Sequence, residues 1–294
     1  MKVRTFSIVA GSMVCNARCP FCVAHMTPKN GIDKTEPSVN WRNFKKACQL
    51  ARDGGCSTAM ITSKGEPTIF PDQVTQFLKA LEAYNFPVVE LQTNGILIAD
   101  GKTNRISDQH LKDWYEAGLT TVAVSICHYD SEKNKQIYMG AGSKPYIDLP
   151  ALIAKLHKYG FSVRLAVVML KGFIDSIEEV EKMVAFAKEH GVEQLTLRPV
   201  SKPDKSENEA IFKWTSEHHV EPTLEGAVNE HLRQIGTPIL DLAHGATVYD
   251  VNGQNVCITN CLTVQPDSDE LRQLIFFPDG HARYTWQYSG AIIF

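Results

Sequence analysis

The sequence predicts an α/β protein, a partial (βα)6 barrel followed by a C-terminal β-rich extension. Short apolar, β-branched segments alternate with segments of helical periodicity along the first two thirds of the chain. Such an alternation is typical of a parallel sheet covered by helices. The chain has 294 residues, 44% of them hydrophobic, which is enough material for one large core.

Six segments of β character define the predicted sheet. They are short and rich in β-branched residues, and the third leads into the turn signal Thr93-Asn94-Gly95. The predicted strands are residues 3–14, 57–62, 88–92, 120–126, 162–170 and 194–200.

Helices are predicted between these strands from their periodicity and their end signals. Pro71 suits the first turn of a helix, and Ser107 is a typical N-cap residue. Gly118, Gly160 and Gly191 each stand where a helix should end. The predicted helices are residues 41–52, 71–84, 107–117, 150–159 and 176–190.

The βα rhythm ends near residue 200. Residues 201–236 contain a charged, proline-containing stretch, which we interpret as a lid loop or linker, and then a helix over 224–235. Residues 237–294 have the pattern of short strands with Gly and Asp turns. We therefore expect a barrel over residues 1–200, a charged loop and helix, and a C-terminal β-rich capping extension.

Composition limits the classes of partner and the compartment. A formal net charge of -3 gives no overall attraction to nucleic acid or to a membrane surface. No apolar run approaches the ~20 residues of a membrane span, and the N-terminal segment reads as a strand, not as a signal peptide. We expect a cytoplasmic protein, where thiols stay reduced. For the eight cysteines we therefore expect roles as metal ligands or as buried hydrophobic residues, and we expect disulfides less.

Three cysteines, Cys15, Cys19 and Cys22, follow the first predicted strand in a C-x3-C-x2-C spacing. Thiolates are the usual ligands of iron–sulfur clusters, and a four-iron cluster has four ligand positions. Three thiolates leave one iron open, and an open metal position is where chemistry occurs. The alternatives are a zinc site completed by a ligand such as His25, or a coincidental spacing.

The cysteine loop resembles the motif of the radical S-adenosylmethionine (SAM) superfamily, including the aromatic Phe21 before the third cysteine. The segment Gly65-Glu66-Pro67-Thr68, after the second predicted strand, is similar to the family's GEP segment, whose backbone binds the amino group of SAM. A glycine permits the close approach that this contact needs. Many members have a glycine pair before the glutamate, whereas Ser63-Lys64 precede a single glycine here. Lys64 would face solvent or a substrate anion.

Other predicted strands resemble those of the MoaA-like subfamily, which implies a TIM-like barrel. By this resemblance the hydroxyls of Thr93 and Ser125 would hold the carboxylate or ribose of SAM. Arg164 and Lys171 become candidates for carboxylate or phosphate contacts, and Arg198 for a place at the barrel mouth. Functional side chains of such barrels gather at the C-terminal strand ends. A capping or surface role is the alternative for each residue.

The C-terminal extension holds a further pair, Cys257 and Cys261. Relatives carry auxiliary clusters in such extensions, but the place of their third cysteine reads Tyr284-Thr285-Trp286 here. Two thiols do not complete a usual cluster site. The resemblance therefore implies a degenerate auxiliary-cluster region without iron, with a second cluster at Cys257 and Cys261 as the alternative. About four irons per chain would indicate the first, and about eight the second.

The resemblance also implies the function. A [4Fe–4S] cluster would bind SAM, and one electron from an external donor such as flavodoxin or ferredoxin would cleave its sulfonium. The 5′-deoxyadenosyl radical would then abstract a hydrogen atom from a small, anionic, nucleotide-like substrate. Cys127, near the predicted barrel mouth, is a candidate catalytic residue that would donate a hydrogen atom to the product radical. The alternative is that Cys127 is a small buried hydrophobic residue.

Other functions stay open at this point. A peptide or an RNA base is an alternative substrate, and a non-catalytic zinc or iron–sulfur binding protein is an alternative of another class. The missing third C-terminal cysteine argues against the activity of MoaA itself.

Overall fold

A computed structural model describes most of the chain, namely residues 1–100, 105–140, 146–200, 206–242, 245–259 and 269–294. Its strands are β1 (Lys2–Val9), β2 (Thr58–Thr62), β3 (Val88–Thr93), β4 (Thr121–Ile126), β5 (Ser162–Met169), β6 (Gln194–Pro199), β7 (Thr237–Asp241), β8 (Thr247–Val251), β9 (Gln254–Ile258), β10 (Glu270–Phe276) and β11 (Ala282–Arg283). These described strands form one sheet in the order β11-β10-β1-β2-β3-β4-β5-β6-β9-β8-β7.

Helices connect the strands. They are α1 (Val23–Met26), α2 (Trp41–Asp53), α3 (Pro71–Leu81), α4 (Ile96–Ala99), α5 (Asp108–Glu116), α6 (Ser131–Met139), α7 (Leu149–Lys158), α8 (Ile177–Glu189), α9 (Glu209–His218) and α10 (Pro222–Ile235), with short 3-10 turns η1 (Pro67–Ile69) and η2 (Glu82–Tyr84). Across the described ranges, each helix is too short or too polar to cross a bilayer.

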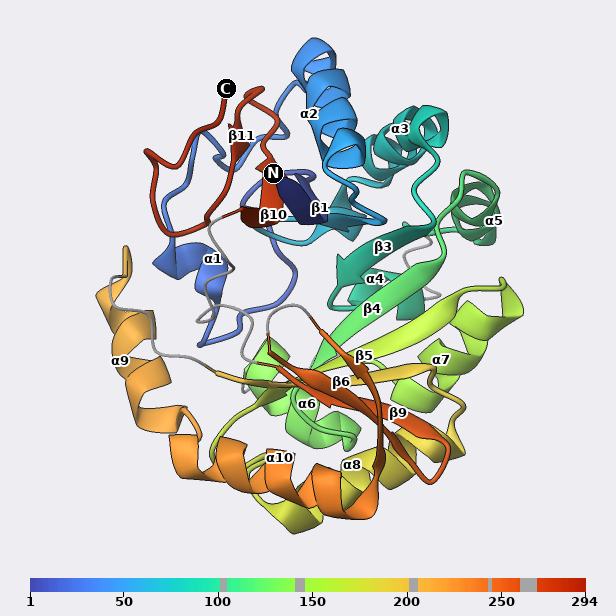
Figure 1. The fold of residues 1–294 in the computed structure, drawn as a ribbon, viewed down its shortest axis with the longest axis vertical. Coiled ribbons are helices and arrows are strands. Elements are labelled where there is room, and N and C mark those ends of the chain that lie inside the picture. Colours follow the sequence, from blue (N-terminus) through green and yellow to red (C-terminus); the bar gives the residue numbers. More distant parts are fainter. Residues whose placement is uncertain (101–104, 141–145, 201–205, 243–244, 260–268) are drawn as a thin grey trace.

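Strands β1 to β6 run parallel to their neighbours, as βα units require. The sheet curves, and α2, α3, α5, α7 and α8 lie on its convex side (Figure 1). The concave side faces α1 and α9. This arrangement confirms the predicted α/β class and its parallel sheet.

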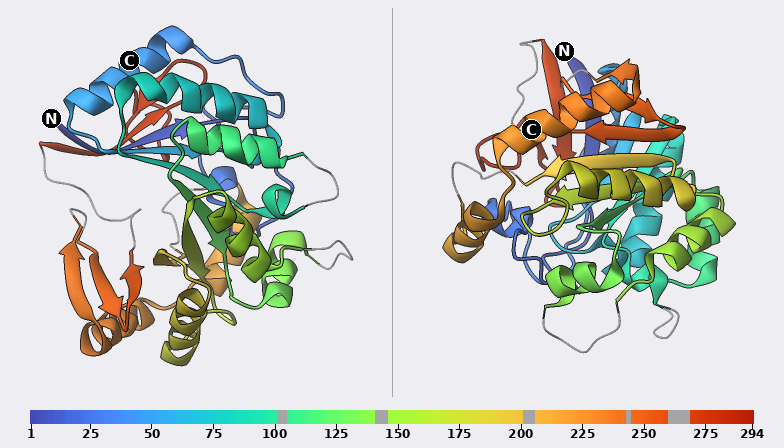
Figure 2. Two further views of the ribbon diagram at one scale, coloured as in Figure 1. Left: turned by 90° about the vertical axis from the view of Figure 1, so that its right-hand side faces the viewer. Right: turned by 90° about the horizontal axis from the view of Figure 1, so that it is seen from below.

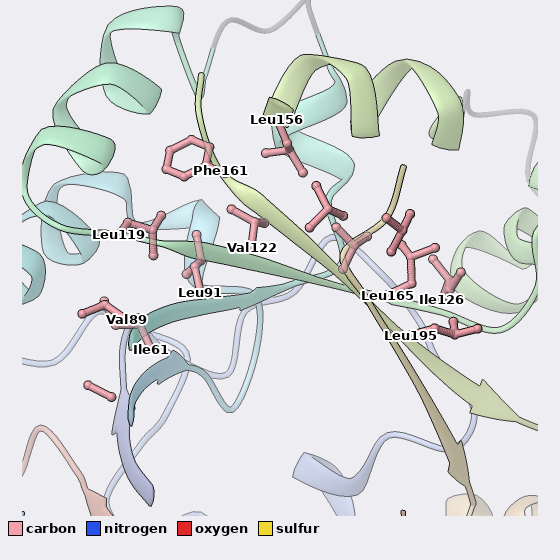
Figure 3. Packing of buried hydrophobic residues seen from close by; sticks show 14 of the residues in the cluster. Ile61, Val89, Leu91, Leu119, Val122, Ile126, Leu156, Phe161, Leu165 and Leu195 are labelled. Atoms are coloured by element: carbon pink, nitrogen blue, oxygen red, sulfur yellow. The ribbon is translucent and has the colours of Figure 1, made fainter. Parts of the chain in front are cut away.

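The two faces of the sheet differ in polarity because side chains alternate along a strand. On the convex face, buried side chains such as Leu91, Val122 and Leu165 pack with Leu156 of α7 (Figure 3). In β5 the intervening residues are only half-buried, and Arg164 is one of them. Polar and half-buried side chains therefore line the concave face, inside the partial barrel.

The predicted strands and helices of the first 200 residues are present, with shifted ends. The largest shift concerns the first strand, which was predicted to reach Val14 but ends at Val9. Gly11 explains the difference, because its φ of +68° lies in the left-handed region and breaks the extended backbone. The chain after Gly11 turns across the strand ends and becomes the cysteine loop.

Four of the described helices were not predicted: the short helices α1 and α4, and the longer helices α6 and α9. Helix α6 follows β4, where Asp130 caps its N-terminus by accepting from the backbone N–H groups of Glu132 and Lys133. Helix α9 occupies part of the stretch interpreted as a loop or linker, so that interpretation is wrong for residues 209–218. The side chain of Asn208 caps α9, and the helix buries Thr215 against the rest of the protein.

The C-terminal segment is β-rich, as predicted, and its strands join both ends of the barrel sheet. Strand β9 pairs in parallel with β6 and antiparallel with β8. Strand β10 pairs in parallel with β1 at the opposite end of the sheet. Figure 2 shows the β7–β8–β9 ribbon well apart from β10 and β11. The extension thus continues the barrel sheet and does not form a separate sheet on top of it.

Candidate active site at the cysteine loop

Cys15, Cys19 and Cys22 lie on one loop beyond the C-terminal end of β1. The loop is compact: the backbone N–H of Cys22 donates to the carbonyl of Cys19 at 3.2 Å, and α1 starts directly after Cys22. Cys15 is exposed at the surface of the loop, and the other two residues are half-buried. All three are free thiols.

The thiols are electrostatic neighbours. Partial burial of its sulfur, with the charges of Glu66 and Cys22, raises the pKa of Cys15 to about 11. Burial, together with the charges of Cys22 and Cys15, also raises the pKa of Cys19. Three thiolates on one short loop repel one another unless a cation lies among them. The donor set therefore fits a thiolate-ligated metal cluster. Within the described ranges, no three His, Cys, Asp or Glu side chains converge on a single-ion position.

Glu66 fastens the cysteine loop to the ends of β2 and β3. Its backbone N–H donates to the carbonyl of Val14 at 3.0 Å, one residue before the first cysteine. Its carboxylate accepts from Thr68 N–H at 3.1 Å, Thr68 Oγ1 at 2.7 Å, Thr93 Oγ1 at 2.6 Å and Asn94 N–H at 2.8 Å. Glu66 is only 2% exposed, and this burial raises its pKa despite those bonds. The carboxylate is thus occupied by donors of the protein.

Glu66→Gln is expected to destabilise the fold by about 1–3 kcal/mol, because the new amide N–H would face a backbone or hydroxyl donor. Urea unfolding of the purified protein measures the change. Thr68→Val is the matched control: it removes one hydroxyl donor from the carboxylate and should cost less than the glutamine variant. Equal unfolding midpoints for wild type and Glu66→Gln would contradict the role of Glu66 in fastening the loop.

Gly65 is required by a close contact within the chain. A Cβ at this position would lie 2.1 Å from the carbonyl oxygen of Val14 and 2.7 Å from that of Ser12. Real side chains do not tolerate such distances. The family resemblance attributes this glycine to the approach of SAM, and the structure adds a second reason, the approach of the cysteine loop itself. Binding of SAM by Gly65, Glu66 and Pro67 stays a prediction.

Asn94 links the end of β3 to the cysteine loop, and the sequence did not single it out. Its Nδ2 donates to Asn16 Oδ1 at 2.7 Å and lies 3.8 Å from Cys15 Sγ. In the sequence, Asn94 was marked only as part of the turn signal Thr93-Asn94-Gly95. The hydroxyl of Thr93 donates to Glu66 and accepts from the N–H of Gly95 at 3.0 Å. The contact of Thr93 with SAM also stays a prediction.

An aromatic wall, formed by Phe21, Tyr138 and Trp214, stands beside the loop. The ring centroid of Phe21 lies 6.4 Å from Tyr138 of α6 and 6.3 Å from Trp214 of α9. Tyr138 Oη forms a hydrogen bond with Ser125 Oγ at 3.0 Å. Helices α6 and α9, which the sequence did not predict, therefore supply the side chains around Phe21. Contacts of Phe21 and Ser125 with a cofactor stay predictions.

Cys127 is buried against the same wall. It is fully shielded from solvent and clusters with Ile137, Tyr138 and Leu170, with Cys19 packed beside this group. Burial raises its pKa, so the thiol stays protonated at neutral pH. A protonated thiol suits both the predicted hydrogen-atom donor and a small hydrophobic residue. The catalytic role stays a prediction.

The expected location of Arg164 is wrong. The sequence placed it with the groups at the C-terminal strand ends, but β5 begins at Ser162, so Arg164 lies near the opposite end. There its guanidinium pairs with the buried carboxylate of Glu90, which also accepts from Gln92 Nε2 at 2.9 Å. Arg198 does lie near the C-terminal end of β6, where it is half-buried, and its role stays a prediction.

Lys64 points into the protein. It is 2% exposed, which excludes the solvent-facing alternative. Its Nζ donates to Thr27 Oγ1 and lies 5.8 Å from the ring centroid of Trp286. Burial lowers the pKa of Lys64 to about 8, although the charges of Cys22 and Glu207 act in the opposite direction.

The C-terminal cysteines are only partly described. Cys257 is buried in β9, paired in register with Thr196 of β6. Cys261 lies outside the described residues. The degenerate auxiliary-cluster region stays a prediction.

Residues 11–194 match the model of the Radical SAM superfamily. The GTP 3',8-cyclase of Lactiplantibacillus plantarum is 27% identical over 182 residues, covering 60% of this chain and 49% of that protein. The GTP 3',8-cyclase of Vibrio vulnificus strain YJ016 is 24% identical over 220 residues, covering 74% of this chain and 58% of that protein. The chain thus spans about half the length of these curated relatives.

Solved structures share the fold. Streptococcus suis SuiB bound to S-adenosylmethionine superposes with a TM-score of 0.61 at 15% identity, covering 96% of this chain and 60% of that chain. Native anSMEcpe with bound AdoMet gives a TM-score of 0.58 at 14% identity, covering 96% and 74% of the two chains. Both likenesses support the partial TIM-like barrel predicted from the sequence.

Proposed function

Because this chain belongs to the radical SAM superfamily, we propose that it holds a [4Fe–4S] cluster and SAM and uses them to abstract a hydrogen atom from a substrate. The family implies both cofactors. The observation that carries the proposal is the set of three free thiols on one loop, at the C-terminal end of the barrel strands. Barrels of this kind place their chemistry at that end.

Cys15, Cys19 and Cys22 would hold the cluster and leave one iron open for SAM. When bound, the reduced cluster would supply the electron that splits the sulfonium of SAM. The residues of the chain would hold the cysteine loop in place and shield the site from water. Glu66 and Asn94 keep the loop fixed against the strand ends. A fixed loop presents the open metal position in one orientation, as a preorganised site requires.

Exclusion of water would fall to the aromatic wall. Phe21, Tyr138 and Trp214 cover one side of the loop with apolar rings from three different segments. A reactive radical needs such shielding, because solvent access invites side reactions. Tyr138 also ties Ser125 in place by its hydrogen bond, and we propose Ser125 as a contact to SAM.

A small, anionic, nucleotide-like molecule is the substrate class we propose. Curated relatives carry the name GTP 3',8-cyclase, which supports a nucleotide. Arg198 supports an anion, because it lies near the C-terminal end of β6 and no hydrogen bond or ion pair of its side chain is seen among the described residues. The proposal further includes an external one-electron donor of the flavodoxin or ferredoxin type and a reducing, cytoplasmic setting.

Anaerobic reconstitution with iron and sulfide tests the proposal. The protein should turn brown, bind about four irons per chain, show a low-temperature EPR signal on reduction, and release 5′-deoxyadenosine from SAM with dithionite. Omission of SAM, and of dithionite, are the controls. A colourless protein with one zinc per chain, or a reduced cluster that never cleaves SAM, would contradict it.

A further inference from the structure

Two departures from the family pattern contact each other in the structure. Lys64 stands where many members of the family have a glycine, and Trp286 belongs to the stretch Tyr284-Thr285-Trp286, which occupies the place of the third C-terminal cysteine of MoaA-like relatives. These residues are separated by most of the chain, yet the Lys64 ammonium lies over the Trp286 ring at 5.8 Å. That distance is within the range of a cation–π contact.

Trp286 is held firmly in this position. Its Nε1–H donates to Gln273 Oε1 of β10 at 2.8 Å, and its ring packs edge-to-face on Phe277 with centroids 5.6 Å apart. It also packs against a buried cluster that includes Val9 and Ile32. The ring is therefore a rigid surface beneath the lysine side chain.

The ammonium of Lys64 is buried with little compensation. Its hydrogen-bond partner is the neutral Thr27 Oγ1, and no carboxylate oxygen of the described residues lies within 4.0 Å of its Nζ. Cys22 and, more weakly, Glu207 are its electrostatic neighbours. A buried cation without an opposite charge is costly. A cluster ligated by three thiolates carries net negative charge, so it would provide the missing compensation.

We propose that the positive charge of Lys64 raises the reduction potential of the cluster on Cys15, Cys19 and Cys22. In this proposal Trp286 is a positioning residue that holds the Lys64 ammonium in place. This inference rests on the proposed function. Reduction adds one electron, taken from a one-electron donor of the flavodoxin or ferredoxin class or from dithionite, and no bond forms or breaks. A fixed positive charge in a poorly solvated place stabilises the reduced, more negative cluster over the oxidised one.

An EPR-monitored redox titration of reconstituted protein tests the proposal. Lys64→Met removes the charge with little loss of volume, so its midpoint potential should become more negative than that of wild type. Lys182→Met is the control, because Lys182 lies on α8 in exposed ion pairs with Glu178 and Glu179. That variant should leave the potential unchanged. Iron content and far-UV circular dichroism of each variant verify that it is folded and loaded.

Trp286→Leu tests the second half of the proposal. The single variant should shift the potential in the same direction as Lys64→Met, by a smaller amount. In the Lys64→Met background it should produce no further shift, since Trp286 acts only through the ammonium.

Each failure has a distinct signature. A wild-type protein without a reducible cluster contradicts the proposed function. A wild-type cluster whose potential is the same in Lys64→Met contradicts the role of Lys64. An equal shift from Trp286→Leu in both backgrounds contradicts the coupling. If Lys64→Met does not fold, Lys64→Gln and the Trp286→Leu single variant decide the matter by the same measurement.

Discussion

Replacing Cys15, Cys19 and Cys22 together with alanine is expected to abolish iron binding and release of 5′-deoxyadenosine. The thiols lie on a loop that is exposed to half-buried, so their removal should change the free energy of unfolding of the iron-free protein by no more than about 0.5 kcal/mol. The three cysteines would thus contribute mainly chemistry, and only Cys19 also packs beside the buried cluster of Cys127. Iron analysis, absorbance of the reconstituted protein and chromatography of the SAM products measure the effect.

Cys48→Ala is the matched control for the cysteine variant. Cys48 is buried on the inner face of α2, in the hydrophobic core. Its replacement should lower stability modestly while iron content and SAM cleavage stay at the wild-type level. A triple variant that keeps its colour and still splits SAM would remove the basis of the proposed function.

Gly65→Ala is expected to cause the second largest loss, in cluster content. The new Cβ would collide with the carbonyl oxygens of Ser12 and Val14. These are backbone atoms, so a change of side-chain rotamer cannot relieve the clash. The backbone before Cys15 must therefore move, at a cost of about 1–3 kcal/mol for overpacking. Because that backbone leads directly into the first thiol, iron per chain should fall more sharply than the unfolding midpoint.

Gly226→Ala provides the control for the glycine change. Gly226 lies within α10, and a Cβ there would meet no atom within 4 Å. Alanine should stabilise that helix by about 0.5–1 kcal/mol, since glycine is a poor helix former. Full iron loading of Gly65→Ala would show that the loop does not depend on this contact.

Local patterns predicted the regular part of the fold well. The helix over residues 71–84 was recognised from its periodicity and from Pro71, and the structure has α3 and η2 there. Ser107 caps α5 by accepting from the N–H of His110 at 3.2 Å, as its residue type indicated. These features depend on neighbours within a few residues, which the sequence displays directly.

Features that depend on distant partners were missed. Helix α9 lies in a charged, proline-containing stretch, and the contact of its Trp214 with Phe21 joins residues almost 200 positions apart. The role of Glu66 depends on Asn94, and the pairing of Arg164 depends on Glu90, on other strands. Arg164 was misplaced because its candidate role came from family resemblance, although the predicted strand 162–170 already puts it near the N-terminal end. Family resemblance identified the cysteine loop, but the contacts that fasten it required three-dimensional structure.

The pairing of β10 with β1 has a consequence for synthesis on the ribosome. Arg4 of β1 and Glu270 of β10 are ion-paired across 266 positions of sequence. During translation, β1 emerges long before β10 exists, so one hydrogen-bonding edge of β1 stays open while the other strands assemble. Contacts of such long sequence separation slow folding and leave unpaired edges prone to aggregation. Pulse-labelled hydrogen exchange during refolding should therefore find the β1–β10 amides among the last to be protected.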